Sequence, residues 1–159
     1  MSGSERNYQG VKGWLLLLCV CLAILDPMTI FISLMAVVDL LQPYLANDPA
    51  LFRMVLVSGL CNICLMVYSM YTGLSLWRLW PHAVENAKRY LLILFHYSFL
   101  SMFFPQLFGI SEKTLTEIYN ASPLNNALLM LYATAWFFYV RKSKRVRATY
   151  RNSEPATTE

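Results

Sequence analysis

The sequence predicts an all-α membrane protein whose four transmembrane helices form an antiparallel bundle with both termini in the cytoplasm. Three observations lead to this prediction. Of the 159 residues, 57% are hydrophobic and only 14% are charged, against about 25% charged residues in an average soluble domain. Four segments are apolar over about the length of a bilayer crossing. Basic residues are concentrated in the segments that would lie on one side of the membrane.

The first apolar segment, residues 13–38, sets the class of protein. At about 1.5 Å per residue it is longer than the roughly 30 Å hydrocarbon core of a bilayer. Asp26 and two hydroxyl residues are almost its only polar positions, whereas a helix of a soluble protein would carry a polar face throughout this length. Pro27 lacks a backbone donor, so we expect a bend that frees the carbonyl one turn earlier, near Ala23.

Local signals place the ends of the other helices. Residues 39–43, which include two polar side chains and a proline, are predicted to end the first helix. Asp48 and Pro49 combine a capping carboxylate with a proline at the first helical position, so the second helix is predicted to begin there. Pro81 is predicted to open the third helix, and Pro105 to kink it near its far end. The four predicted spans are residues 14–38, 51–77, 90–108 and 124–140.

The spans divide the chain into three parts. Residues 1–12 are predicted to be a cytoplasmic tail, and residues 13–140 to be the transmembrane domain. Residues 141–159 are predicted to be a second cytoplasmic tail that is basic at first and then disordered. The polar link at residues 111–123 has a short apolar face and is predicted to hold a helix on the membrane surface.

The distribution of basic residues predicts the orientation. Eleven of the 13 Lys and Arg residues lie in the two tails or between the second and third spans, and Arg53 and Lys113 lie on the opposite side. Because loops rich in Lys and Arg stay in the cytoplasm, both termini are predicted to be cytoplasmic, which requires an even number of spans. The same rule accounts for the formal net charge of +4, so no nucleic acid is expected as a partner.

The second span carries a stripe of small and polar residues. Their offsets in the sequence place them on one face of a helix with 3.6 residues per turn. In membranes such a face usually packs against other helices, because small side chains allow close approach and polar groups form hydrogen bonds there. The residues of this helix-packing stripe are Ser58, Asn62, Ser69 and Gly73.

Three side chains within the spans form a candidate intramembrane polar site: Asp26, Asn62 and His96. A carboxylate in mid-bilayer costs about 2.5–3.5 kcal/mol on insertion scales, so Asp26 should face the bundle interior and have a partner. Asn62 matches its depth best, and the carbonyl near Ala23 is the other first choice; either partner would make Asp26 structural. Pairing with His96 would instead create a proton-responsive pair. The sequence leaves both interpretations open.

The basic segment after the fourth span is predicted to anchor the chain on anionic lipid headgroups, at about 1 kcal/mol per basic residue. Its residues are Arg141, Lys142, Lys144, Arg145 and Arg147. Cys61 and Cys64 form a CxxC pattern in mid-helix, unlike the partly exposed helix starts of reactive pairs, and with His96 they lack a fourth zinc ligand. We therefore expect no metal and no cofactor. The sequence has no hydrolase, kinase or nucleotide-binding motif, so no catalytic residue and no enzymatic activity are expected.

Several short patterns together resemble one family. They are Gly13-Trp14-Leu15, Tyr71-x-Gly73-x-x-Leu76-Trp77, Pro81-x-Ala83-Val84, Lys88-x-Tyr90-Leu91 and the ending Tyr139-Val140-x-x-Ser143-Lys144-Arg145-Val146-Arg147-x-Thr149-Tyr150. Over about residues 10–151 the chain resembles the domain-of-unknown-function 2569 family, whose members are small bacterial membrane proteins with four predicted helices. The resemblance implies an inner-membrane location and no established activity, so it assigns no functional residues.

Two functions fit these features. The first is a non-enzymatic accessory or interaction subunit, which needs only packing faces and a basic tail. The second is a small homo-oligomeric transporter or proton-linked sensor that uses Asp26 and His96. The expected partners are the lipid bilayer, its anionic headgroups at the basic tail, and either a larger inner-membrane protein or further copies of the chain.

Overall fold

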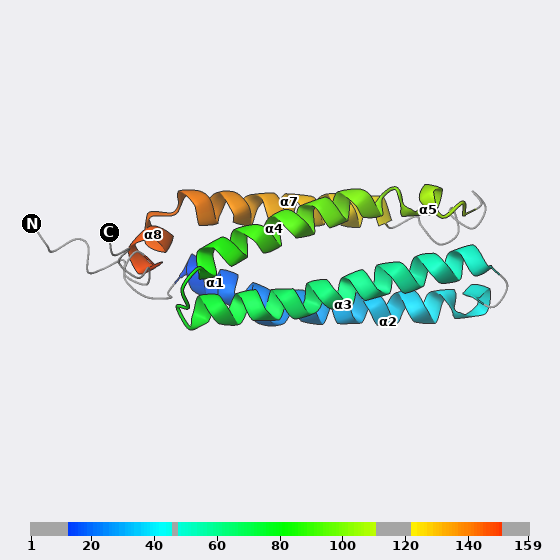
Figure 1. The fold of residues 1–159 in the computed structure, drawn as a ribbon, viewed down its shortest axis with the longest axis horizontal. Coiled ribbons are helices and arrows are strands. Elements are labelled where there is room, and N and C mark those ends of the chain that lie inside the picture. The colour runs from blue at the N-terminus through cyan, green and yellow to red at the C-terminus, as the bar shows by residue number, and fades with distance from the viewer. Residues whose placement is uncertain (1–12, 46–47, 111–121, 151–159) are drawn as a thin grey trace, which may run out of the picture.

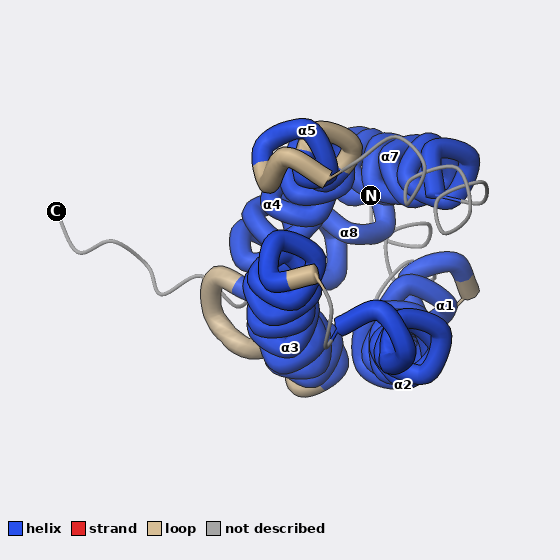
Figure 2. The backbone as a smooth tube through the Cα atoms, turned by 90° about the vertical axis from the view of Figure 1, so that its right-hand side faces the viewer, coloured by secondary structure: helices blue, strands red, loops and turns tan. Residues whose placement is uncertain are grey.

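The computed structural model describes residues 13–45, 48–110 and 122–150, and every regular element in these ranges is a helix. Long helical rods lie lengthwise beside one another in two layers, with α4 and α7 in one and α2 and α3 in the other (Figure 1, Figure 2). Helix α8 and the start of α1 lie at one end of the molecule, and α5 lies at the other (Figure 1). The elements are α1 (Trp14–Val20), the π-helical turn η2 (Cys21–Leu25), α2 (Asp26–Leu45), α3 (Pro49–Trp77), α4 (Ala83–Ser101), α5 (Phe104–Leu107), α7 (Ser122–Lys142) and α8 (Lys144–Tyr150).

Two stretches of the described residues are long and apolar enough to cross a membrane. They are Trp14–Asp39, with 26 residues, and Pro49–Trp77, with 29 residues; the mean hydropathy over an 18-residue part of each is 2.6 and 2.0. Only a minority of the side chains in both are buried, and large apolar ones such as Ile32 and Leu60 are exposed. Extended apolar surface of this kind favours a membrane location, because a soluble helix would bury it.

The predicted start of the second helix is confirmed. Asp48 is the N-cap of α3, its Oδ1 accepts hydrogen bonds from the backbone N–H groups of Ala50 and Leu51 at 2.9 and 3.2 Å, and Pro49 is the first helical residue. The carboxylate satisfies donors that would otherwise lack a partner in the first turn. This cap fixes the point from which the 29 residues of α3 run.

Other predicted boundaries differ from the structure. The first rod does not end near Val38, because α2 continues to Leu45. The third segment was expected to run from 90 to 108, whereas α4 covers Ala83–Ser101 and the short α5, with Pro105 in its first turn, follows after a break. Proline is tolerated in the first turn of a helix, so Pro105 starts a new helix instead of kinking the old one. The predicted surface helix at 111–123 and the tail at 1–12 lie outside the described residues, apart from the first two residues of α7.

The buried apolar side chains form two clusters along the rods. The larger lies toward the end of the molecule that carries α8 and includes Leu18, Leu22, Leu76 and Tyr90. The smaller joins the end of α2 and the start of α3 to α5, through Leu41, Leu51, Met54, Phe104 and Ile110. Phe104 of α5 and Ile110 after it therefore connect this end of α2 and α3 to the other layer.

The first part of the predicted basic tail contains a short helix that the sequence analysis did not predict. Helix α8 spans Lys144–Tyr150, and the residues beyond it lie outside the described part of the chain. Val146 and Tyr150 are buried, whereas Lys144 and Arg147 are exposed. The order of residues in the Ser-Lys-Arg-Val-Arg-x-Thr-Tyr ending is thus explained: one face packs on the bundle of rods and the other carries charge.

Tyr150 fastens α8 to the end of α3. Its hydroxyl donates a 2.6 Å hydrogen bond to the carbonyl oxygen of Leu76, in the last turn of α3. The same oxygen accepts a longer hydrogen bond of 3.3 Å from the N–H of Leu79. Burial raises the pKa of Tyr150 above its ordinary value, so the hydroxyl remains protonated and can donate.

Replacing Tyr150 by phenylalanine should loosen α8 without unfolding the rest of the molecule. A hydrogen bond of this type contributes about 0.5–1.5 kcal/mol, so trypsin should cleave at Lys144 and Arg147 several times faster in the variant. Tyr71→Phe, which changes an exposed tyrosine of α3, is the control and should digest as the parent does. Equal digestion of all three proteins would show that the hydroxyl does not hold α8 in place.

Candidate functional site

The site is built around a π-helical turn just before Pro27. In η2 the N–H of Asp26 donates to the carbonyl of Cys21, five residues earlier. In this register the carbonyl of Leu22 would pair with residue 27, and proline has no N–H to give. Ser69 of α3 supplies the missing donor, with its Oγ 2.7 Å from the Leu22 oxygen. The freed carbonyl therefore lies at Leu22, one residue before the predicted position.

Gly73 brings α3 against the same turn. A Cβ atom at this position would lie 2.5 Å from the backbone nitrogen of Ala23 and 2.8 Å from its Cα. Only glycine permits this approach, because any side chain would overlap backbone atoms that cannot rotate away. The close contact also brings Ser69 within hydrogen-bond reach of Leu22.

The carboxylate of Asp26 accepts hydrogen bonds from two tyrosines. The hydroxyl of Tyr132, on α7, donates to Oδ1 at 2.8 Å, and the hydroxyl of Tyr90, on α4, donates to Oδ2 at 3.2 Å. Tyr90 is fully buried, and the edge of its ring meets Tyr68 of α3 at a centroid distance of 5.7 Å. Both oxygens of the carboxylate thus have a donor, as a polar group away from water requires.

This cluster joins all four rods. Helix α7 packs along α4 and is not among the helices in extensive contact with α2, so the hydrogen bond from Tyr132 to Asp26 links two rods that otherwise touch little. Ser69 adds α3 through the Leu22 carbonyl. We call Asp26, Ser69, Tyr90 and Tyr132 the polar tie.

The structure does not bring together the three residues of the predicted polar site. Asn62 lies on α3 seven residues before Ser69, about 10 Å along the helix, and is half-buried without a hydrogen bond to Asp26. His96 is exposed, and its Nδ1 donates to the carbonyl of Leu92 on its own helix at 2.7 Å. The partners of Asp26 are therefore tyrosines that the sequence analysis did not consider. A phenol near the middle of an apolar segment, as at Tyr132, is the signal that could have identified one of them.

The predicted packing stripe is buried more deeply at one end than at the other. Ser69 and Gly73 are buried, while Ser58 and Asn62 are half-buried. The hydroxyl of Ser58 bonds to the carbonyl of Val55 at 3.1 Å. The stripe is therefore most deeply buried where α3 approaches η2 and the polar tie.

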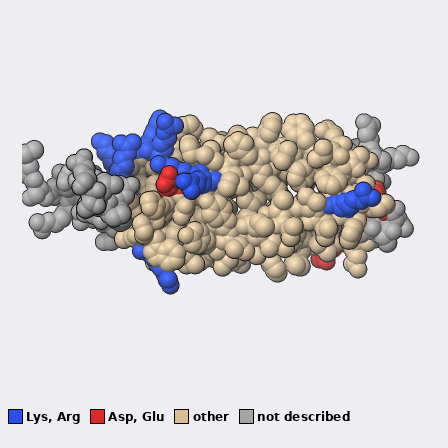
Figure 3. Space-filling view, in the orientation of Figure 1, with Lys and Arg blue, Asp and Glu red and all other residues tan. Residues whose placement is uncertain are grey.

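The basic anchor lies at the end of the molecule that carries α8. Figure 3 shows Lys and Arg side chains gathered there, with an acidic group among them, while the middle of this face carries almost no charge. Arg141, Lys142, Lys144 and Arg147 are exposed; the side chain of Arg145 lies outside the described set. The Nζ of Lys142 lies 5.7 Å from the ring centre of Phe138, and Arg147 donates to the carbonyl of Arg141 at 3.2 Å. The anchor is therefore a surface of exposed cations.

The side chains that could bind a metal ion are scattered in the described ranges. They contain no group of three or more His, Cys, Asp or Glu side chains placed to hold a metal ion. Cys19 and Cys21 are buried, Cys61 is half-buried and Cys64 is exposed, and all four thiols are free.

The fold defines a helical protein with two helices long and apolar enough to span a membrane. Its long helices are joined through the carboxylate of Asp26. The chain belongs to the family described as "Protein of unknown function (DUF2569)", whose model matches residues 8–151. This agrees with the resemblance seen in the sequence. No curated protein and no solved structure matches the chain.

Proposed function

We propose that this chain is a multi-pass protein of the bacterial inner membrane that crosses the bilayer four times and serves as a non-enzymatic accessory subunit of a larger membrane protein. Helices α4 and α7, with 19 and 21 residues, are about 28 and 31 Å long at 1.5 Å per residue, close to the thickness of the hydrocarbon core. They run beside the two more apolar rods (Figure 1), and the basic residues gather at one end of all four (Figure 3). These features support four spans with both termini in the cytoplasm.

Reporter fusions test this topology. Fusions after Trp80 and Arg147 should give cytoplasmic reporter activity, because these positions lie at the basic end of the rods. Fusions near Asn47 and Glu117 should give periplasmic activity. A periplasmic signal from the fusion after Arg147 would contradict an even number of spans.

The observation that carries the accessory role is the occupation of both Asp26 oxygens. A transport site must exchange its ligand, whereas here the two phenol hydroxyls of Tyr90 and Tyr132 already use the carboxylate to join helices. The rods are thereby held as one unit, and its outward surface is apolar at positions such as Phe31, Ile32 and Met35 of α2. Such a surface suits lipid or the transmembrane helices of a partner.

The alternative of a proton-linked sensor or homo-oligomeric transporter needs Asp26 and His96 on one polar path. The exposed His96, bonded to its own helix, gives no support to that path. Asp26 alone can still change its protonation, and the Asp26→Asn experiment in the Discussion tests this.

The mass of the detergent-solubilised complex tests the accessory role. The parent protein should purify with a larger membrane protein in a fixed ratio, and Asp26→Asn should keep that ratio because it preserves the shape of the polar tie. A symmetric homo-oligomer of this chain, with no second protein, would contradict the accessory role and favour the alternative.

A further inference from the structure

A cavity of about 280 Å³ lies at the end of the molecule that carries α8. Its lining comes from the turn between α3 and α4, with Trp80 and His82, from α4, with Glu85 and Lys88, and from Tyr150 of α8. Small-molecule pockets usually measure roughly 300–1,000 Å³, so this cavity suits a group of a few heavy atoms. It lies apart from the polar tie.

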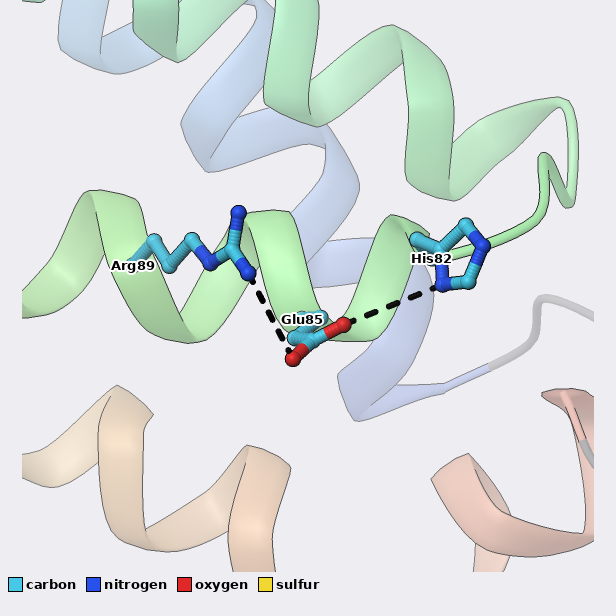
Figure 4. Close-up of polar contacts among 3 residues, drawn as sticks. All are labelled: His82, Glu85 and Arg89. Carbon is cyan, nitrogen blue, oxygen red and sulfur yellow. Dashed lines mark ion pairs between the residues drawn. The ribbon is translucent and has the colours of Figure 1, made fainter.

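The cavity has a cation and an anion in its wall. Lys88 is half-buried, and Glu85 is exposed three residues before it. Glu85 forms two ion pairs, in which Arg89 Nη2 lies 3.6 Å from Oε1 and His82 Nδ1 lies 3.8 Å from Oε2 (Figure 4). Both separations exceed hydrogen-bond distance, so the carboxylate of Glu85 can accept a donor from a ligand.

The position of the cavity matches the headgroup layer of a membrane. Trp80 has 40% of its surface exposed, and the guanidinium carbon of Arg78 lies 5.9 Å from its ring centre. Tryptophan and arginine are typical of the boundary between lipid tails and water. In the topology proposed above, the apolar part of α4 begins directly after Lys88 and Arg89.

We propose that this cavity binds the headgroup of a phospholipid that carries both a phosphate and a primary ammonium, the phosphoethanolamine type. Lys88 donates to the phosphate, and the ammonium of the headgroup donates to the carboxylate of Glu85. Trp80 lines the same cavity, and its ring would contact the glycerol and the first carbons of the acyl chains. The inference rests on the membrane location in the proposed function.

Lys88 and Glu85 together favour this headgroup over others. A headgroup with a phosphate and no cation gains from Lys88 but places its negative charge near Glu85, which is unfavourable. A trimethylated ammonium keeps the positive charge but has no N–H to donate to Glu85. The pair therefore favours the primary ammonium over both.

Binding of lipids to the full chain in detergent, measured by native mass spectrometry, tests the proposal. The three probes are phosphatidylethanolamine, phosphatidylcholine and phosphatidylglycerol with the same acyl chains. The parent should bind phosphatidylethanolamine about tenfold more tightly than phosphatidylcholine, as loss of one charge-assisted hydrogen bond implies. Glu85→Gln should remove this preference, and Lys88→Gln should weaken binding of all three lipids.

A control variant and melting temperatures separate the lipid preference from effects on folding. Arg53→Gln changes an exposed basic residue of α3 outside the cavity wall and should leave the preference unchanged, and all variants should melt at the parent temperature. Equal binding of phosphatidylethanolamine and phosphatidylcholine by the parent, or a preference that survives Glu85→Gln, would overturn the proposal. Soluble glycerophosphoethanolamine that competes as well as the intact lipid would also overturn it, since the occupant would then be a soluble molecule. Reporter fusions judge the membrane topology separately.

Discussion

Replacing Gly73 by leucine should destabilise the protein by about 3 kcal/mol, the upper part of the range for overpacked interiors. The added Cβ would lie 2.5 Å from the backbone nitrogen of Ala23, and neither helix can relieve this overlap by a change of rotamer. Parting the helices would also break the hydrogen bond from Ser69 to the Leu22 carbonyl. Unfolding in detergent, followed by circular dichroism, measures the loss.

Gly59→Ala is the matched control on the same helix. Its Cβ would lie 3.4 Å from Cδ1 of Leu34, the end of a flexible side chain, so this variant should unfold nearly as the parent does. Gly73→Ala should fall between the control and Gly73→Leu. If Gly73→Leu and the parent unfold under the same conditions, α3 does not approach η2 as closely as the structure shows.

Replacing Asp26 by leucine should cost about 2–4 kcal/mol, because it leaves the hydroxyls of Tyr90 and Tyr132 without an acceptor. An unpaired buried polar group costs about 1–3 kcal/mol, and Tyr90 is fully buried. Asp26→Asn should cost much less, since the amide keeps the shape and can pair with both hydroxyls. Melting temperatures of the two variants in one detergent give the comparison.

Tyr132→Phe tests one of the two hydrogen bonds that Asp26 accepts. It removes the 2.8 Å hydrogen bond to Asp26 and should cost about 1–3 kcal/mol. Tyr139→Phe is its control on the same helix. Within residues 13–45, 48–110 and 122–150 the Tyr139 hydroxyl forms no hydrogen bond. A loss of equal size in both variants would mean that packing, and not the link to Asp26, explains the effect.

Asp26→Asn also separates the two functions. If Asp26 only joins helices, the stability and the complex of this variant should follow the parent at every pH near neutrality. If the parent instead changes its stability or its assembly with pH, and the variant does not, Asp26 is a proton site and the sensor alternative is favoured.

The sequence predicted those parts of the fold that depend on neighbouring residues. Asp48 and Pro49 fix the start of α3 through bonds within one turn. The spacing of Ser69 and Gly73 placed both on one face of a helix, and both are buried. Helix type, caps and faces are local properties, so they can be inferred without knowing which helices meet.

The parts that were missed depend on how separate helices align. Asp26 and Tyr132 are 106 residues apart, and no periodicity within one helix states which residue lies opposite another. Depth estimates favoured Asn62 because they assumed straight helices of one register. Helix α8 was missed for a similar reason, since its apolar face, with Val146 and Tyr150, is short and becomes visible only against the end of α3.

The π turn at Cys21–Leu25 sets which side of the first rod faces the other helices after it. A π turn holds one residue more than an α turn, so the helix after it is rotated by about 100° relative to a continuous α-helix. That rotation lets Leu18 before the turn, Leu22 within it and Asp26 after it all face inward. If the same residues formed a regular α-helix instead, Asp26 would turn by about 100° away from Tyr90 and Tyr132. The inward position of Asp26 therefore depends on the hydrogen-bond register of this turn more than on the identity of its apolar side chains.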